Sequence, residues 1–167
     1  MPMKKKTANK KTATKKTSGV NTQGMDPEFI SLLNAMKPLD KIEVWDEILE
    51  EMVPHITYNF IDSTAEYIIA TALNDPEIDI ESDMNEDKKE RIYKFGYYGC
   101  DCGLVLKTTG IQVFASYALA EFDTEYYKEY ASVKTIAEIE KTLDRLAQNV
   151  IAKTILAAAK RYSVKLK

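Results

Sequence analysis

Residues 133–162 read VKTIAEIEKTLDRLAQNVIAKTILAAAKRY, and this stretch decides the fold class that the sequence predicts. Its large apolar residues recur every three or four positions, which is the period of an amphipathic α-helix. Ser132 is the expected N-cap, and the bases near the end of the stretch suit the negative end of the helix dipole. We expect this helix to organise the core through one apolar stripe, which comprises Ile136, Ile139, Leu143, Leu146 and Val150 and then drifts to Ile151, Ile155 and Ala158.

Shorter helices are predicted upstream of this stretch. The first covers residues 29–36 and ends before Pro38, which cannot continue it. A second helix, capped by Asp40, extends to Pro54. A third closes near Asn74. The apolar face of this third helix consists of Ile61, Ala65, Ile68 and Ala72.

The middle of the chain allows two interpretations. Residues 86–106 can form a helix, although three glycines within eight positions would weaken it by about 1 kcal/mol each. Alternatively, residues 104–106 and 111–117 alternate like two strands around a turn at residues 108–110. We favour the helix. The sequence therefore predicts an all-α domain of about five to seven helices over residues 25–167, with a small β-hairpin near 104–117 as the alternative.

The net charge of −3 conceals three blocks of opposite sign. Residues 1–24 carry seven lysines and no acid, and residues 25–87 carry seventeen acids against two lysines. Residues 88–167 carry fourteen bases against nine acids. Such asymmetry concerns partners more than fold, so it indicates contacts with charged molecules.

The first block is predicted to be a disordered tail. It contains three versions of a five-residue unit, KKTAN, KKTAT and KKTSG, and no unit has an aromatic or large aliphatic residue to bury. Lysines neutralise phosphates whatever the base sequence, so we expect the tail to bind nucleic acid without sequence preference. The residues assigned to this contact are Lys4, Lys5, Lys6, Lys10, Lys11, Lys15 and Lys16.

An acidic run from Asp75 to Glu90 has the spacing of a calcium loop in two registers. In both registers the sixth position, where the loop needs glycine for its turn, holds a large residue, either Ile80 or Met84. The sequence therefore predicts a solvated acidic loop and no metal site.

Few residues could carry covalent or metal chemistry. Cys100 and Cys102 are the two cysteines and His55 is the one histidine, so a four-ligand zinc site cannot be assembled. We expect the cysteines to be small buried residues and His55 to be a structural or surface residue. Because the chain also lacks a phosphate-binding glycine loop and a nucleophile elbow, we expect no catalytic residues, no enzyme activity and no cofactor.

Three tyrosines are candidates for binding a partner, because tyrosine combines a large apolar ring with a polar tip. Tyr126 and Tyr130 are four residues apart and would share one face of a helix beside Lys128. The third candidate is Tyr127.

The sequence favours a non-catalytic interaction protein, in which the basic tail contacts nucleic acid and the acidic body engages a protein partner. One alternative is a structural, self-associating subunit of a nucleoprotein particle such as a virion, and another is an acidic mimic of nucleic acid. No apolar stretch follows the first lysines as in a signal peptide, so a cytoplasmic or nucleoid-associated location, or one within a virion, is expected. The longest apolar runs are too short to cross a bilayer, so no membrane contact is expected.

Overall fold

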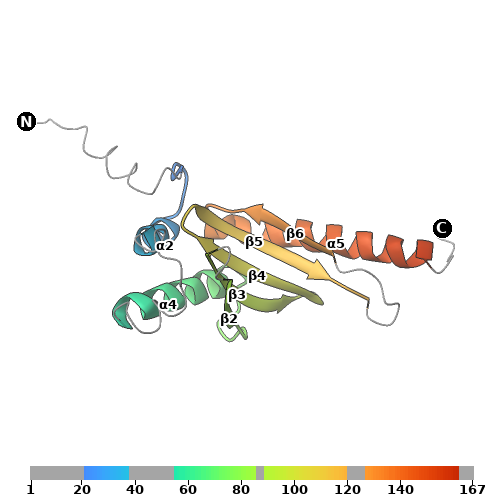
Figure 1. Cartoon of the computed structure of the whole chain (residues 1–167), viewed down its shortest axis with the longest axis horizontal. Helices are drawn as coiled ribbons and strands as arrows, with labels where there is room; N and C mark the ends of the chain where they lie inside the picture. The colour runs from blue at the N-terminus through green and yellow to red at the C-terminus, as the bar shows by residue number, and fades with distance from the viewer. Residues whose placement is uncertain (1–20, 38–54, 86–88, 120–126, 162–167) are drawn as a thin grey trace, which may run out of the picture.

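The computed structural model describes residues 21–37, 55–85, 89–119 and 127–161, with the backbone alone for residues 55–59. Over these residues a five-stranded antiparallel sheet is flanked by helices (Figure 1). The helices are α2 (Pro27–Met36), α4 (His55–Ala72) and α5 (Ile139–Arg161), and a 3-10 turn, η4 (Ile136–Glu138), leads into α5. The strands are β2 (Glu81–Asn85), β3 (Glu90–Tyr97), β4 (Cys100–Lys107), β5 (Gly110–Tyr117) and β6 (Tyr127–Ser132).

The sheet is a meander in which each strand pairs with the next in sequence, in the order β2-β3-β4-β5-β6. The predicted all-α domain of about five to seven helices, and with it the helix over residues 86–106, is therefore wrong. The hairpin alternative near 104–117 is correct, and it forms only part of a larger sheet.

Period-two burial explains why the middle of the chain forms strands. On β3, Arg91, Tyr93 and Phe95 are buried on one face, and each lies opposite a buried residue of β4. The glycines that would weaken a helix have specific places here. Gly99 follows Tyr98 in the β3–β4 turn, where both residues have positive φ (79° and 49°), as a tight hairpin turn requires.

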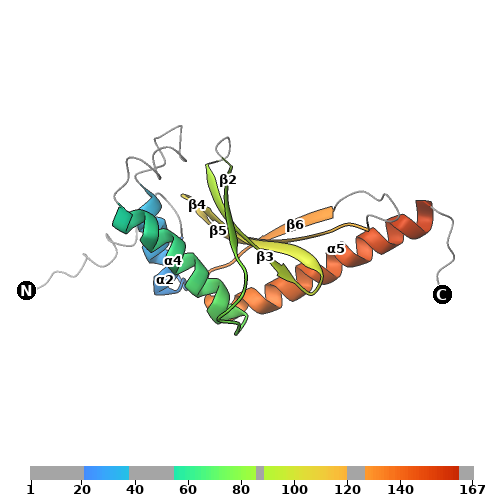
Figure 2. The same cartoon turned by 90° about the horizontal axis from the view of Figure 1, so that it is seen from below.

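The helices of the described residues lie on one side of the sheet, with α2 and α4 towards one end and α5 along β5 and β6 (Figure 2). The residues buried between helices and sheet form one continuous core, to which α2 contributes Phe29 and Leu32, β4 contributes Leu104, and α5 contributes Leu143. We call this side the covered face, and the opposite side the open face.

The helix predicted over residues 29–36 is confirmed as α2, and the third predicted helix, which closes near Asn74, is confirmed as α4. The long C-terminal helix is confirmed too, and Ile139, Leu143, Leu146 and Val150 are buried as predicted. Its start differs, because Ser132 ends β6 while the Thr135 side chain caps η4 by accepting a hydrogen bond from the Glu138 N–H (3.2 Å). The basic tail and the helix predicted over residues 40–53 lie outside the described residues.

The predicted drift of the α5 stripe is wrong at Ile155, whose side chain is exposed.

No helix in the described part of the chain is both long enough and apolar enough to span a bilayer.

Candidate functional site

The open face of the sheet carries a hollow of about 700 Å³. Side chains alternate along strands, so residues next to the buried ones point away from the helices. Lys94 on β3, Asp101 on β4, Ser116 on β5 and Lys128 on β6 line the hollow in this way. The segment that leads into β2, residues 79–81, forms a further side.

The floor of the hollow is aromatic. Phe114 is buried and lies against Gly103 of the neighbouring strand, where an added Cβ would come within 2.4 Å of the ring. The Lys128 ammonium lies 4.2 Å from the centre of the Phe114 ring and 5.3 Å from that of Tyr130. We call Phe114, Lys128 and Tyr130 the aromatic cluster, in which the ammonium makes cation–π contacts with both rings.

Carboxylates line the hollow as well. Asp79, Glu81 and Asp101, which we call the carboxylate wall, outnumber the two lysines that share the lining. One of these lysines, Lys94, forms an ion pair with Asp83 (3.4 Å). The backbone N–H of Met84 and this lysine together lower the pKa of the Asp83 carboxyl. The lining therefore combines net negative charge with an aromatic surface.

The structure separates the tyrosines that the sequence singles out. Tyr130 lies exposed on the open face, whereas Tyr127 is partly buried against the core on the covered face. The prediction that Tyr126 and Tyr130 share a helical face is wrong, because residues 127–132 form a strand. Tyr126 itself and the seven lysines of the tail lie outside the described residues.

Sequence reasoning missed Phe114 and Asp101 as site residues. In residues 111–117 the apolar alternation runs through Ile111, Val113 and Ala115, so Phe114 falls among the outward positions with Gln112 and Ser116. A large aromatic residue on the polar side of a strand was the available signal.

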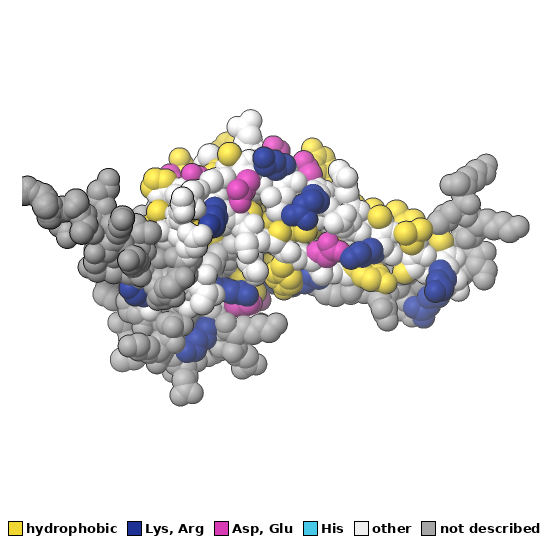
Figure 3. All heavy atoms as spheres, turned by 90° about the horizontal axis from the view of Figure 1, so that it is seen from above, with side chains coloured by type: hydrophobic (Ala, Val, Ile, Leu, Met, Phe, Trp, Pro, Cys, Tyr) yellow, Lys and Arg dark blue, Asp and Glu magenta, His cyan; other side chains and the backbone are white. Residues whose placement is uncertain are grey.

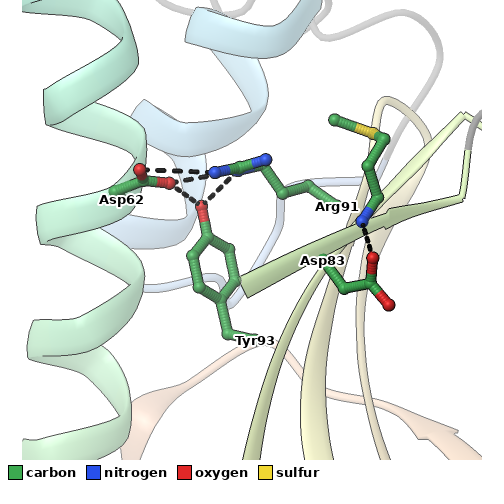
Figure 4. A network of polar contacts seen from close by, with 5 residues as sticks. Asp62, Asp83, Arg91 and Tyr93 are labelled. Atoms are coloured by element: carbon green, nitrogen blue, oxygen red, sulfur yellow. Dashed lines mark hydrogen bonds and ion pairs between the residues drawn. The ribbon is translucent and has the colours of Figure 1, made fainter. Parts of the chain in front are cut away.

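A buried polar network ties α4 to β3 (Figure 4). Arg91 donates to both oxygens of Asp62 (3.0 and 3.3 Å), and the Tyr93 hydroxyl donates to the same carboxylate. Burial and the hydrogen bond to Asp62 raise the pKa of Tyr93, so its phenol remains a donor. Because Arg91 and Tyr93 both donate to its carboxylate, Asp62 holds α4 against β3. We therefore assign Asp62 a structural role.

The two thiols lie on the covered face. Cys100 and Cys102 are buried, as predicted, and neither forms a disulfide. Burial raises the pKa of Cys102 to about 12, so the nucleophilic thiolate is strongly disfavoured. Within the described ranges, no group of three or more His, Cys, Asp or Glu residues is arranged to hold a metal ion.

The acidic run is a turn followed by a strand. Asp75 accepts a hydrogen bond from the N–H of Glu77 (3.2 Å), and the chain then extends into β2. Glu81 and Asp83 are two residues apart on β2 and so lie on the same face of the sheet. The expectation that residues 75–90 do not form a calcium site stays a prediction.

Comparisons of the chain with protein-family models, with curated proteins and with solved structures gave no match.

Proposed function

We propose that this protein is a non-catalytic binding protein whose open sheet face takes an extended, positively charged segment of a protein partner. The observation that carries this proposal is the hollow, in which the carboxylate wall lies beside the aromatic cluster. A basic side chain of the partner would pair with the wall, and its apolar or aromatic neighbours would pack on the exposed ring of Tyr130.

The lining of the hollow favours a chain segment over a small molecule. Sites for small molecules are mostly apolar and enclose the ligand, with a few polar groups to orient it. Here charged side chains from β3, β4 and β6 surround a single aromatic floor. An extended segment can match such an alternation of charge and ring, because its own side chains alternate at the same spacing.

The carboxylate wall also argues against nucleic acid on this face, because phosphates would meet three negative side chains. The basic tail remains the proposed nucleic-acid contact, supported by its seven lysines and the absence of acids among residues 1–24. The protein would thus join a nucleic acid and a protein partner.

Fluorescence anisotropy with a labelled peptide of alternating lysine and tyrosine tests the open-face site, with a peptide of alternating glutamate and tyrosine as the control probe. The triple variant Asp79→Asn, Glu81→Gln, Asp101→Asn should bind the basic peptide roughly tenfold more weakly, since each exposed ion pair contributes about 0.2–1 kcal/mol. Glu77→Gln, an exposed acid outside the hollow, is the matched control and should bind like the parent. Equal binding of both peptides, or an unchanged affinity in the triple variant, would refute the site.

Deleting residues 1–24 tests the tail separately. Binding to duplex DNA should disappear while binding of the basic peptide remains. In the full chain the logarithm of the DNA affinity should fall with the logarithm of salt concentration by a slope no steeper than about −6, because seven lysines are present.

A further inference from the structure

Two exposed apolar surfaces lie apart from the open face, and the first is the projecting end of α5. Near this end the Thr154 hydroxyl donates a hydrogen bond to the carbonyl oxygen of Tyr117, the last residue of β5 (3.3 Å). From Thr154 to Arg161 the helix continues for about 10 Å. Figures 1 and 2 show that this end runs beyond the strands, although Ala158 and Ala159 on it are buried. On this end Ile155 is 45% exposed and Leu156 is 56% exposed. Figure 3 shows hydrophobic side chains gathered there, with basic side chains beyond them.

The second surface is a groove of about 310 Å³ between α2 and α4. Its aromatic side chains come from α4, where Phe60 is 41% exposed and Tyr67 is 55% exposed. These two residues are seven apart, so they lie two turns along the same side of the helix. We call this surface the α2/α4 groove; it is lined by Pro27, Glu28, Ser31, Phe60, Ser63, Thr64 and Tyr67.

The two surfaces are complementary in apolar character and charge. Ile155 and Leu156 present two exposed apolar side chains on a helix, and the groove offers an apolar trough about two helical turns long. Residues 145–167 contain six bases and no acid, and Lys160 is exposed in the last turn of α5. The groove contains Glu28, and the exposed Glu66 precedes Tyr67.

We propose that the projecting end of α5 in one copy of the chain docks into the α2/α4 groove of a second copy. The helix end and the groove lie at opposite ends of the long axis (Figure 1), so the contact joins different surfaces of the two copies. Each copy in such a pair still presents one unoccupied surface, so the contact propagates into a ring or a filament. This inference is independent of the peptide site. It gives a contact between subunits for the alternative function, a self-associating subunit of a nucleoprotein particle.

Sedimentation velocity of the full chain, from micromolar to millimolar concentration and without nucleic acid, tests the contact. The apolar anchors are few, so a weak association that grows with concentration is expected. The helix-end variant Ile155→Glu, Leu156→Glu and the groove variant Phe60→Glu, Tyr67→Glu should each remain monomeric. Gln148→Glu, an exposed change on α5 before the projecting end, should associate like the parent.

Mixing the two monomeric variants gives the decisive result. The helix-end variant retains an intact groove and the groove variant retains an intact helix end, so their mixture should form one-to-one dimers that do not grow further. A parent chain that stays monomeric at millimolar concentration would overturn the proposal. A groove variant that still self-associates would overturn it too, because α5 would then be pairing with itself.

A charge exchange repeats the test without altering apolar residues, in case the glutamate variants fail to fold. Lys160→Glu and Glu28→Lys should each weaken association severalfold, and the two changes combined in one chain should restore it. If the combined variant does not regain self-association, the predicted pairing of Lys160 with Glu28 of a second copy is contradicted. Circular dichroism melts check that each variant is folded.

Discussion

On the covered face, the sheet contributes Tyr93, Leu104 and Val113, and all three side chains are inaccessible to solvent. On the open face, the same strands contribute Lys94 and Asp101, which line a hollow. The two sets alternate residue by residue along each strand, so one backbone serves both a core and a charged surface. Substitutions on the covered face should therefore change the free energy of unfolding, whereas substitutions on the open face should change the affinity for a partner.

The largest expected effect lies in the core under the covered face. Leu143 of α5 is fully buried, and truncating such a leucine costs about 2–5 kcal/mol. Leu143→Ala should lower the free energy of unfolding by this amount in urea titrations. Lys141→Ala, on the exposed side of the same helix, should change it by less than about 0.5 kcal/mol. Equal midpoints for the two variants would contradict the core assignment.

Local periodicity was enough to predict the helices and not enough to predict the sheet. The apolar residues of α2, α4 and α5 lie within a few positions of one another, so their spacing shows in a short window. By contrast, Ser116 of β5 pairs with Asp101 of β4 on one side and with Lys128 of β6 on the other. Both pairings depend on strand register, which a short window of sequence does not show. Two residues of the carboxylate wall, Asp79 and Glu81, belong to an acidic run that is visible in the sequence. The third, Asp101, lies near them only because of the strand register.

Gly103 lies on the open face of β4, opposite Phe114 of β5. Its missing side chain admits the Phe114 ring on the open face, so an added methyl group must displace the ring. Gly103→Ala should destabilise the protein by about 1–3 kcal/mol and also weaken binding of the basic peptide. Gly96→Ala is the control for stability, because an added Cβ at Gly96 meets no atom within 4 Å. Equal melting temperatures for the two variants would contradict the dependence of the Phe114 ring on Gly103.

Burial of the Cys102 thiol on the covered face predicts that the free energy of unfolding depends on pH. The folded pKa of Cys102 is raised to about 12, whereas an unfolded cysteine titrates near about 8.5. Its contribution to stability is therefore complete below pH about 8.5 and is lost as the pH rises towards 12, because the unfolded chain ionises first. Urea titrations across this range should show a shallower loss of stability for Cys102→Ala than for the parent. Parallel curves for the two proteins would contradict the burial of this thiol.

The smallest effect on stability is expected at Tyr130, which is exposed on the open face. Tyr130→Ala should leave the free energy of unfolding within about 0.5 kcal/mol of the parent. The same variant should weaken binding of the basic peptide, because a partner side chain loses part of the aromatic cluster. A variant that loses stability instead would place Tyr130 in the core.

Photo-crosslinking tests the central claim, that the open face receives a basic segment, most directly. A lysine–tyrosine peptide carrying a photoreactive group is irradiated with the full chain, and mass spectrometry then identifies the attached residues. The structure predicts attachment to the lining of the hollow, at residues 79–81 and around Asp101 and Lys128. Attachment confined to α4 or to the projecting end of α5 would contradict the claim.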